Sequence, residues 1–221
     1  MLTKIIDKMK YYITLAIKKP YLIRSYIYKK HLGVIISIPI YKKDVSLNNK
    51  HLTIKNSTNL KEINNFYKRM NRDSINPTEI GKWLNRDYDC FLVKYEDRII
   101  GSMWIFKNKF NLNNTSGRTL SEQKTVNFDK NSIYGANVII DERYRGKGIN
   151  QYLLNYVISH YANNSEFKRL IVITGASNGA YIRSTMKNSG KLIGITQVIN
   201  VLGVKRRKEI FLDKNEKTWN N

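Results

Sequence analysis

Residues 134–162, YGANVIIDERYRGKGINQYLLNYVISHYA, constrain the fold more than any other part of the chain. The β-branched apolar stretch at 134–141 predicts a strand, and the apolar spacing of 149–162 predicts a helix. A short loop with Gly146 and Gly148 joins the two. A strand that runs through a glycine loop into a helix is a unit of α/β folds.

The remaining elements extend this pattern in both directions. The last two predicted strands, at 192–202 and 208–212, form a hairpin, which makes the predicted sheet mixed instead of purely parallel. Residues 107–131 are polar and rich in Asn, Ser and Thr, which predicts a surface insertion, with or without a hairpin of its own. Strands are predicted at 31–41, 52–55, 91–95, 99–105, 169–174, 192–202 and 208–212, and helices at 60–70, 77–84 and 180–188, with Asn76 and Pro77 as a helix start.

Two familiar glycine motifs are poor matches. A dinucleotide fold would place its third glycine at Gln151, where a small residue is needed for helix–strand packing. The segment GASNG matches the nucleophile elbow of hydrolases, with Ser177 as nucleophile. An elbow serine needs a later histidine as its base, and all three histidines precede Ser177.

A third interpretation is phosphate binding by the loop and the start of the helix. Unpaired amides at a helix N-terminus, together with the helix dipole, bind a pyrophosphate, and glycines let the backbone approach it. The pattern R-x-x-G-x-G occurs in two registers. It is complete from Arg143 (RYRGKG) and one residue short from Arg145 (RGKGIN), where Asn150 replaces the last glycine.

The run IIDERYRGKGINQYLL resembles motif A of the GCN5-related N-acetyltransferase (GNAT) superfamily, and the resemblance extends over residues 52–212. It implies an α/β fold with a GNAT-like mixed β-sheet flanked by helices. Counting back from Leu153 and Leu154, which the family places in the helix, assigns the motif to Arg145 and makes the copy from Arg143 accidental.

The resemblance also implies where an acyl-CoA binds. The loop amides would hold the pyrophosphate, the end of strand 134–140 would open away from strand 170–174, and an amide near Val138 or Ile139 would polarise the thioester carbonyl. Asn178 matches an asparagine that contacts the cofactor in many members. The implied cofactor residues are Val138, Ile139, Ile140, Arg145, Gly146, Lys147, Gly148, Ile149, Asn150 and Asn178.

The catalytic groups are less well marked. Many family members carry a tyrosine acid where this chain has Thr185 or Met186, so Tyr181, one turn earlier, or water is the alternative donor. Strand 133–140 lacks a carboxylate, and Asn137 is its candidate catalytic side chain. The general base is left open between Asp141, Glu142, Asp89, Glu96 and catalysis by positioning alone.

Residues 1–45 are expected to form a basic N-terminal extension to an acyltransferase domain at 46–221. Residues 1–19 have the spacing of a basic amphipathic helix, which can pack on its own domain or lie on an anionic membrane. This leader and the segment VLGVKRRK resemble GNAT proteins of bacterial cell-surface polysaccharide synthesis, which implies an amino sugar as acceptor.

The composition limits the other partners. The net charge of +22 could reflect general residue usage as well as a binding surface, so nucleic acid is not expected as a partner. Cys90 is expected to be a buried thiol in a reducing cytoplasm, and the scattered histidines predict no metal. The expected partners are an acyl-CoA and a small amine, with a homodimer left open. The alternative is a catalytically inactive acyl-CoA-binding or membrane-surface module.

Overall fold

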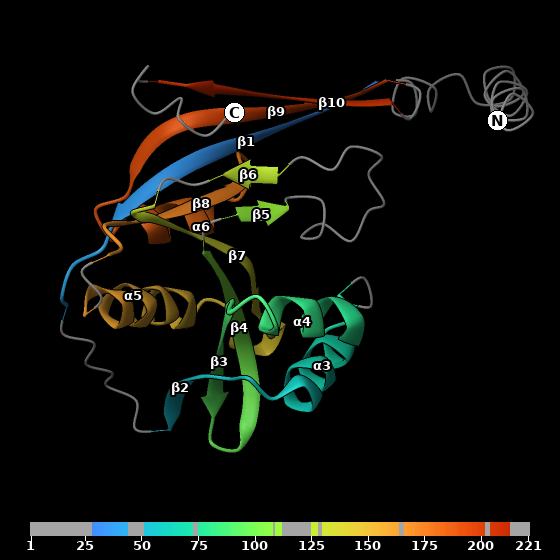
Figure 1. The fold of residues 1–221 in the computed structure, drawn as a ribbon. Helices are drawn as coiled ribbons and strands as arrows, with labels where there is room; N and C mark the ends of the chain where they lie inside the picture. The colour runs from blue at the N-terminus through green and yellow to red at the C-terminus, as the bar shows by residue number, and fades with distance from the viewer. Residues whose placement is uncertain are drawn as a thin grey trace, which may run out of the picture.

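The computed structural model describes residues 28–43, 51–72, 75–107, 109–111, 125–127, 130–163, 166–201 and 204–212. Figure 1 shows the chain as one large sheet with helices on both of its faces. The amphipathic helix expected at 1–19 lies outside these ranges. Within them, no helix has the length and apolar content needed to cross a membrane.

Eight strands form the main sheet, in the order β10-β9-β1-β8-β7-β4-β3-β2. Only β7 and β8 are parallel neighbours, and the other pairs are antiparallel, which confirms the predicted mixed sheet. Its strands are β1 (Tyr28–Pro39), β2 (Leu52–Asn56), β3 (Asp89–Tyr95), β4 (Arg98–Lys107), β7 (Ser132–Ile140), β8 (Arg169–Gly175), β9 (Lys191–Val201) and β10 (Val204–Phe211).

The helices begin where short polar side chains can cap them. Asn59 Oδ1 accepts from the Glu62 amide at 3.0 Å, and Asn76 Oδ1 accepts from the Glu79 amide at 3.0 Å, directly before Pro77. These caps agree with the predicted helix starts. The helices are α3 (Leu60–Arg69), α4 (Pro77–Leu84), α5 (Ile149–Ala162) and α6 (Gly179–Met186), with a short 3₁₀ helix, η2, at Glu142–Tyr144.

Each face of the sheet has its own apolar core. Helices α3 and α4 cover one face, where Trp83 packs edge-to-face on Trp104 at 4.9 Å between ring centroids. Helix α5 covers the other face and buries Leu153, Leu154 and Val157 against the sheet. The thiol of Cys90 is completely buried, as expected of a structural cysteine.

Strand β1 occupies an unexpected position in the middle of the sheet. Although the sequence suggests an extension outside the main domain, β1 pairs with β8 on one side and β9 on the other. Its residues Ile35, Ile36 and Ile38 are fully buried. Figure 1 shows β1 as the blue strand beside the orange β9. Strand β1 therefore separates β9 from β8, and strand β10 lies at the edge of the sheet.

One other strand differs from the predicted one, and the polar insertion contains paired strands, an alternative that its sequence leaves open. β10 begins at Val204, whereas the sequence predicts a strand from Lys208, because the run VKRRK lacks the apolar alternation of a half-buried strand. An edge strand tolerates such charges. The polar insertion contains two short paired strands, β5 (Lys109–Asn111) and β6 (Thr125–Asn127), while 112–124 lie outside the described residues.

Candidate active site

A β-bulge in β7 breaks the regular alternation of its side chains. Residues Ala136 and Ile139 pair with Trp104 and Ser102 of β4, so two residues of β7 face the single residue between them. Asn137 is the extra residue and has a φ of +51°. Asparagine tolerates this left-handed conformation better than most residues, and a bulge bends the strand and frees backbone groups from the ladder.

Strand β7 separates from its other neighbour over the same residues. The parallel register with β8 runs from Ser132↔Arg169 to Gly135↔Val172 and ends there. The C-terminal half of β7 therefore has no partner strand on its β8 side. This is the opening between the two strands that the family resemblance implies.

The loop between β7 and α5 has the geometry of a phosphate cradle. Gly146 and Gly148 have φ values of +76° and +75°, and a Cβ atom at either position would meet no atom within 4 Å. Gly148 caps α5 without a side-chain hydrogen bond. The first intrahelical bond of α5 goes from the Tyr152 amide to Gly148 O, which leaves the amides of residues 149–151 available to a ligand.

A cleft of about 620 Å³ connects this cradle to the opening in the sheet. Its lining carries four cations and, among the residues that the structure describes, no carboxylate. Such a lining suits an anionic ligand. It consists of Arg72, Val138, Ile139, Ile140, Tyr144, Arg145, Gly146, Gly148, Ile149, Asn150, Gln151, Asn178, Ala180, Tyr181, Arg183, Ser184 and Lys187.

The two arginines of the overlapping motifs have different surroundings. Arg145 lines the cleft, donates from Nε to Ile140 O at 3.2 Å and pairs with Glu142 at 3.0 Å. Arg143 does not line it and instead donates to both carboxylate oxygens of Asp141, at 3.1 and 2.6 Å. These contacts, with weaker attraction from Arg98, hold the pKa of buried Asp141 at about 2.

The side chain of Lys147 lies outside the cleft. Its Nζ is 5.2 Å from the centre of the Tyr144 ring, a cation–π contact, and it lines a separate hollow with Arg143 and Leu52. Of the ten implied cofactor residues, Lys147 is therefore the one whose side chain the structure separates from the others. The remaining nine line the 620 Å³ cleft.

The side chain of Asn150, where the family has Gly or Ala, contacts α6. Its Nδ2 donates to Ser184 Oγ at 3.0 Å, and Ser184 Oγ donates to Gln151 Oε1 at 3.0 Å. Gln151 donates in turn to Asn155 Oδ1, which also accepts from Lys43 Nζ at 3.3 Å. A polar network thus joins the first turns of α5 to α6.

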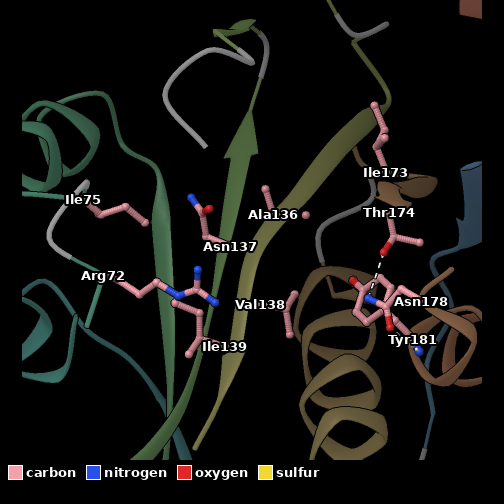
Figure 2. Close-up of a pocket in the computed structure, with 11 residues that line it drawn as sticks. Arg72, Ile75, Ala136, Asn137, Val138, Ile139, Ile173, Thr174, Asn178 and Tyr181 are labelled. Carbon is pink, nitrogen blue, oxygen red and sulfur yellow. Dashed lines mark hydrogen bonds between the residues drawn. The ribbon is translucent and has the colours of Figure 1, made fainter. Parts of the chain in front are cut away.

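Asn178 and Tyr181 stand at the start of α6, across the opening from β7. Asn178 accepts from the Tyr181 amide at 3.3 Å and donates to Thr174 Oγ1 at 3.1 Å. Figure 2 shows both side chains across the gap from Val138. Burial raises the pKa of Tyr181 well above its usual value. Thr185 and Met186, at the family's tyrosine position, line neither cavity of the opening.

A second cavity, of about 290 Å³, continues the cleft toward the turn between α3 and α4. The buried Nδ2 of Asn137 has no hydrogen-bond partner among the described residues. The candidate bases Asp141, Glu142, Asp89 and Glu96 line neither cavity. The 290 Å³ cavity is lined by Arg72, Ile75, Gly135, Ala136, Asn137, Val138, Ile139, Ile173, Thr174, Asn178 and Tyr181.

The other candidate bases have structural contacts. Asp89 accepts hydrogen bonds from Tyr161 and Asn56 and pairs with Lys107 at 3.0 Å. Glu96 forms a surface contact with His51. Within the described part of the chain, no group of three or more His, Cys, Asp or Glu residues could hold a metal ion.

Several lining residues were not predicted from the sequence. Arg183 and Lys187 lie four apart on one face of α6, and this spacing is a usable signal for a basic helix face. Arg72 lies three residues after the last residue of α3 and carries no such signal, because only the tertiary fold places it beside β7.

Comparison with known proteins agrees with this geometry. A model of the acetyltransferase (GNAT) family matches residues 58–194, which is more than half of the chain. The chain belongs to the GNAT family. No curated protein sequence matches it.

Solved structures show the same GNAT fold at low sequence identity. A GCN5-related N-acetyltransferase from Sphaerobacter thermophilus has a TM-score of 0.52 and 15% identity, and the match covers 90% of this chain and 57% of that one. A putative GNAT acetyltransferase from Novosphingobium aromaticivorans has a TM-score of 0.50 and 16% identity, with 76% and 63% covered. A Drosophila protein has a TM-score of 0.56 and 10% identity, with 86% and 58% covered. The chain thus spans less than two thirds of the length of each.

Proposed function

We propose that this GNAT protein transfers an acetyl group from acetyl-CoA to a small amine by direct attack in a ternary complex. The observation that carries the proposal is a continuous passage through the gap between β7 and β8. A phosphate cradle lies at one end of this passage and a separate cavity at the other. The residues shared by the two cavities are Arg72, Val138, Ile139, Asn178 and Tyr181.

Both backbone amides and cationic side chains of the cleft bind the phosphates of acyl-CoA. The amides at the start of α5 and the guanidinium of Arg145 bind the pyrophosphate, since both lie at the two open glycines. Arg183 and Lys187 add positive charge along α6. Acyl-CoA supplies the acyl group in an activated form, as a thioester.

The opened half of β7 receives the acyl end. The bulge at Asn137 and the end of the β8 ladder leave backbone amides near Val138 and Ile139 without strand partners on that side. An amide held in this way donates to the thioester carbonyl, where negative charge develops during attack. Because pairing with β4 holds β7 in place, the amide donor does not have to move as the reaction proceeds.

Tyr181 assists the departing sulfur. Its raised pKa keeps the phenol protonated through the neutral range, so it can donate a hydrogen bond to the thiolate. A thiol has a pKa of about 8.5, below that of the phenol, so the thiolate leaves hydrogen-bonded and does not take the phenolic proton.

The acceptor enters from the 290 Å³ cavity. The C–N bond forms as the C–S bond breaks, and the amine's proton passes to water. Asn137 orients the acceptor by hydrogen bonding. The acceptor is a small amine, and we propose an amino sugar of cell-surface biosynthesis.

Membrane contact through residues 1–19 and homodimer formation stay predictions. Liposome co-sedimentation tests the first, by comparing the full chain with a chain that starts at Tyr28 and so retains β1. Equal sedimentation contradicts a membrane role for the leader.

Acetyl-CoA-dependent thiol release with a panel of amines tests the proposed function. Calorimetry of CoA binding accompanies it, with Gly148→Glu as the control, because a glutamate in the cradle would repel phosphate and strain a residue with positive φ. Binding with turnover of at least one amine supports the enzyme. Tight binding without turnover on any amine supports the inactive acyl-CoA-binding module, and equal binding by Gly148→Glu contradicts the site itself.

A further inference from the structure

The acceptor cavity contains one charged side chain among its described lining residues. This is Arg72, which comes from the turn between α3 and α4. Its backbone is held on both sides, because its amide donates to Tyr67 O at 3.0 Å and its carbonyl accepts from the Ile75 amide at 2.9 Å. No described carboxylate pairs with its guanidinium.

Asn137 contributes a second donor on the same side of β7. In Figure 2 the Arg72 guanidinium and the Asn137 amide come from two different elements and lie near one another beside that strand. The Asn137 Nδ2 is buried and has no partner among the residues that the structure describes, and the residue has a φ of +51°. A buried donor without a partner is uncommon in native structures, and a ligand that accepts from it would account for it.

The two groups together select a particular ligand chemistry. Guanidinium and amide NH groups are all donors, and a guanidinium matches the planar pair of oxygens of a carboxylate or phosphate. A cationic amine without such a group would meet Arg72 with like charge.

Arg72 lines both the cleft and the acceptor cavity, so it lies where the two cavities meet. Arg145, Arg183 and Lys187 line the cradle end of the cleft and are absent from the lining of the acceptor cavity, where Arg72 is present. The cavity volume of about 290 Å³ is roughly ten times that of a liquid water molecule, which suits a monosaccharide or an amino acid.

We propose that the acceptor is a small amine that carries an oxyanion, either carboxylate or phosphate, and that Arg72 and Asn137 bind this group. The inference rests on the proposed acyl transfer. It places Arg72 as the residue that determines acceptor specificity.

The test compares matched acceptors on the full-length protein. Glucosamine 6-phosphate is paired with glucosamine, and glutamate with its diamide, so that the two arms distinguish phosphate from carboxylate. In at least one arm we expect kcat/KM to favour the anionic member. Arg72→Ala should remove this preference, with a loss of about 10- to 100-fold for the anionic member. Arg72→Lys should retain part of it.

CoA binding by the wild type and by Arg72→Ala is measured first, by calorimetry. Failure of the wild type to bind CoA contradicts the proposed function. Arg72→Ala should lower CoA affinity by less than it lowers use of the anionic acceptor, whereas a loss of CoA affinity larger than that for the acceptor would assign Arg72 to the cofactor and overturn the inference. Equal or better use of the uncharged members also overturns it.

If CoA binds and no pair is acetylated, calorimetry of the anionic members with the CoA-loaded protein decides. Binding that Arg72→Ala abolishes supports the inference, and absence of binding refutes it.

Discussion

Asn150 Nδ2 donates to Ser184 Oγ over 3.0 Å, and this bond joins the first turn of α5 to α6. The family's small residue at this position has been replaced by one whose side chain binds the neighbouring helix. The amide group is engaged by Ser184, so Asn150 joins the loop of the proposed phosphate cradle to α6.

Ser184→Ala should therefore weaken both the fold and cofactor binding slightly. The change removes the partner of Asn150 and the donor to Gln151, and we expect the free energy of unfolding to fall by about 1 kcal/mol. CoA affinity should fall by roughly two- to fivefold. Denaturant unfolding and calorimetry measure the two effects. Ser177→Ala, in the exposed loop before α6, is the control and should change neither. An unaltered Ser184→Ala protein would show that the network is unimportant.

Arg145→Ala should reduce CoA affinity more than Arg143→Ala. Arg145 lines the cleft, whereas Arg143 is bound to Asp141 outside it. Loss of one charge-assisted contact predicts a Kd increase of about tenfold for Arg145→Ala and less than threefold for Arg143→Ala. Calorimetry with CoA measures both. A larger effect at Arg143 would show that the complete copy of the motif is the functional one.

Arg143→Ala should instead change how stability depends on pH. The pKa of Asp141 is lowered to about 2, so its contacts stabilise the fold above the unfolded pKa of about 3.9 and are lost as pH falls toward 2. We expect Arg143→Ala to have a lower melting temperature than the wild type at pH 7, with a gap that narrows below about pH 4. Thermal melts across this range measure it, and a constant gap would contradict the ion pair.

Tyr181→Phe removes a hydrogen-bond donor to developing negative charge and should lower kcat about 100-fold while CoA affinity changes little. The phenol would contact sulfur only as the thiolate forms, so its loss affects the transition state more than binding. Because its pKa is raised, kcat should show no loss from Tyr181 ionisation between about pH 6 and 9. Tyr152→Phe, on α5 outside both cavities, is the control. Equal kcat in Tyr181→Phe and wild type would assign the role to water.

Gly33→Ala should destabilise the protein by about 1–3 kcal/mol. A Cβ at Gly33 would lie 2.6 Å from Thr196 Cγ2 of β9 and 2.9 Å from Thr174 O of β8, which is closer than real contacts allow. Gly81→Ala is the matched control, since nothing lies within 4 Å of its Cβ position and alanine favours the helix by up to about 1 kcal/mol. Chemical denaturation compares the two. A Gly33→Ala protein as stable as wild type would contradict the position of β1 between β8 and β9.

Local features of the fold were predictable from the sequence because they depend on neighbouring residues. Helix α5 follows from the apolar spacing of residues 149–162, and the caps at Asn59 and Asn76 follow from short-range hydrogen bonding. The position of β1 was not predictable in this way. Its β-branched residues indicate a strand, but its neighbours in the sheet lie more than a hundred residues further along the chain.

The candidate site also combines residues that the sequence predicts with residues that only the tertiary structure brings together. Gly146, Gly148 and Asn178 lie in recognisable loops, and the structure places them along one cleft. The bulge at Asn137 depends on pairing with β4, and the location of Arg72 depends on how α3 packs against the sheet. Neither leaves a periodic pattern in the sequence.

The central place of β1 has a consequence for biosynthesis. Gly33 pairs with Gly175, so the ribosome must add 142 residues (175 minus 33) before this contact can form. At about 5–20 residues per second, this interval is roughly 7–28 s, during which β1 has apolar residues and two unpaired edges. Strand β1 is thus synthesised long before either of its partners, and the nascent chain needs protection from aggregation until β8 and β9 emerge.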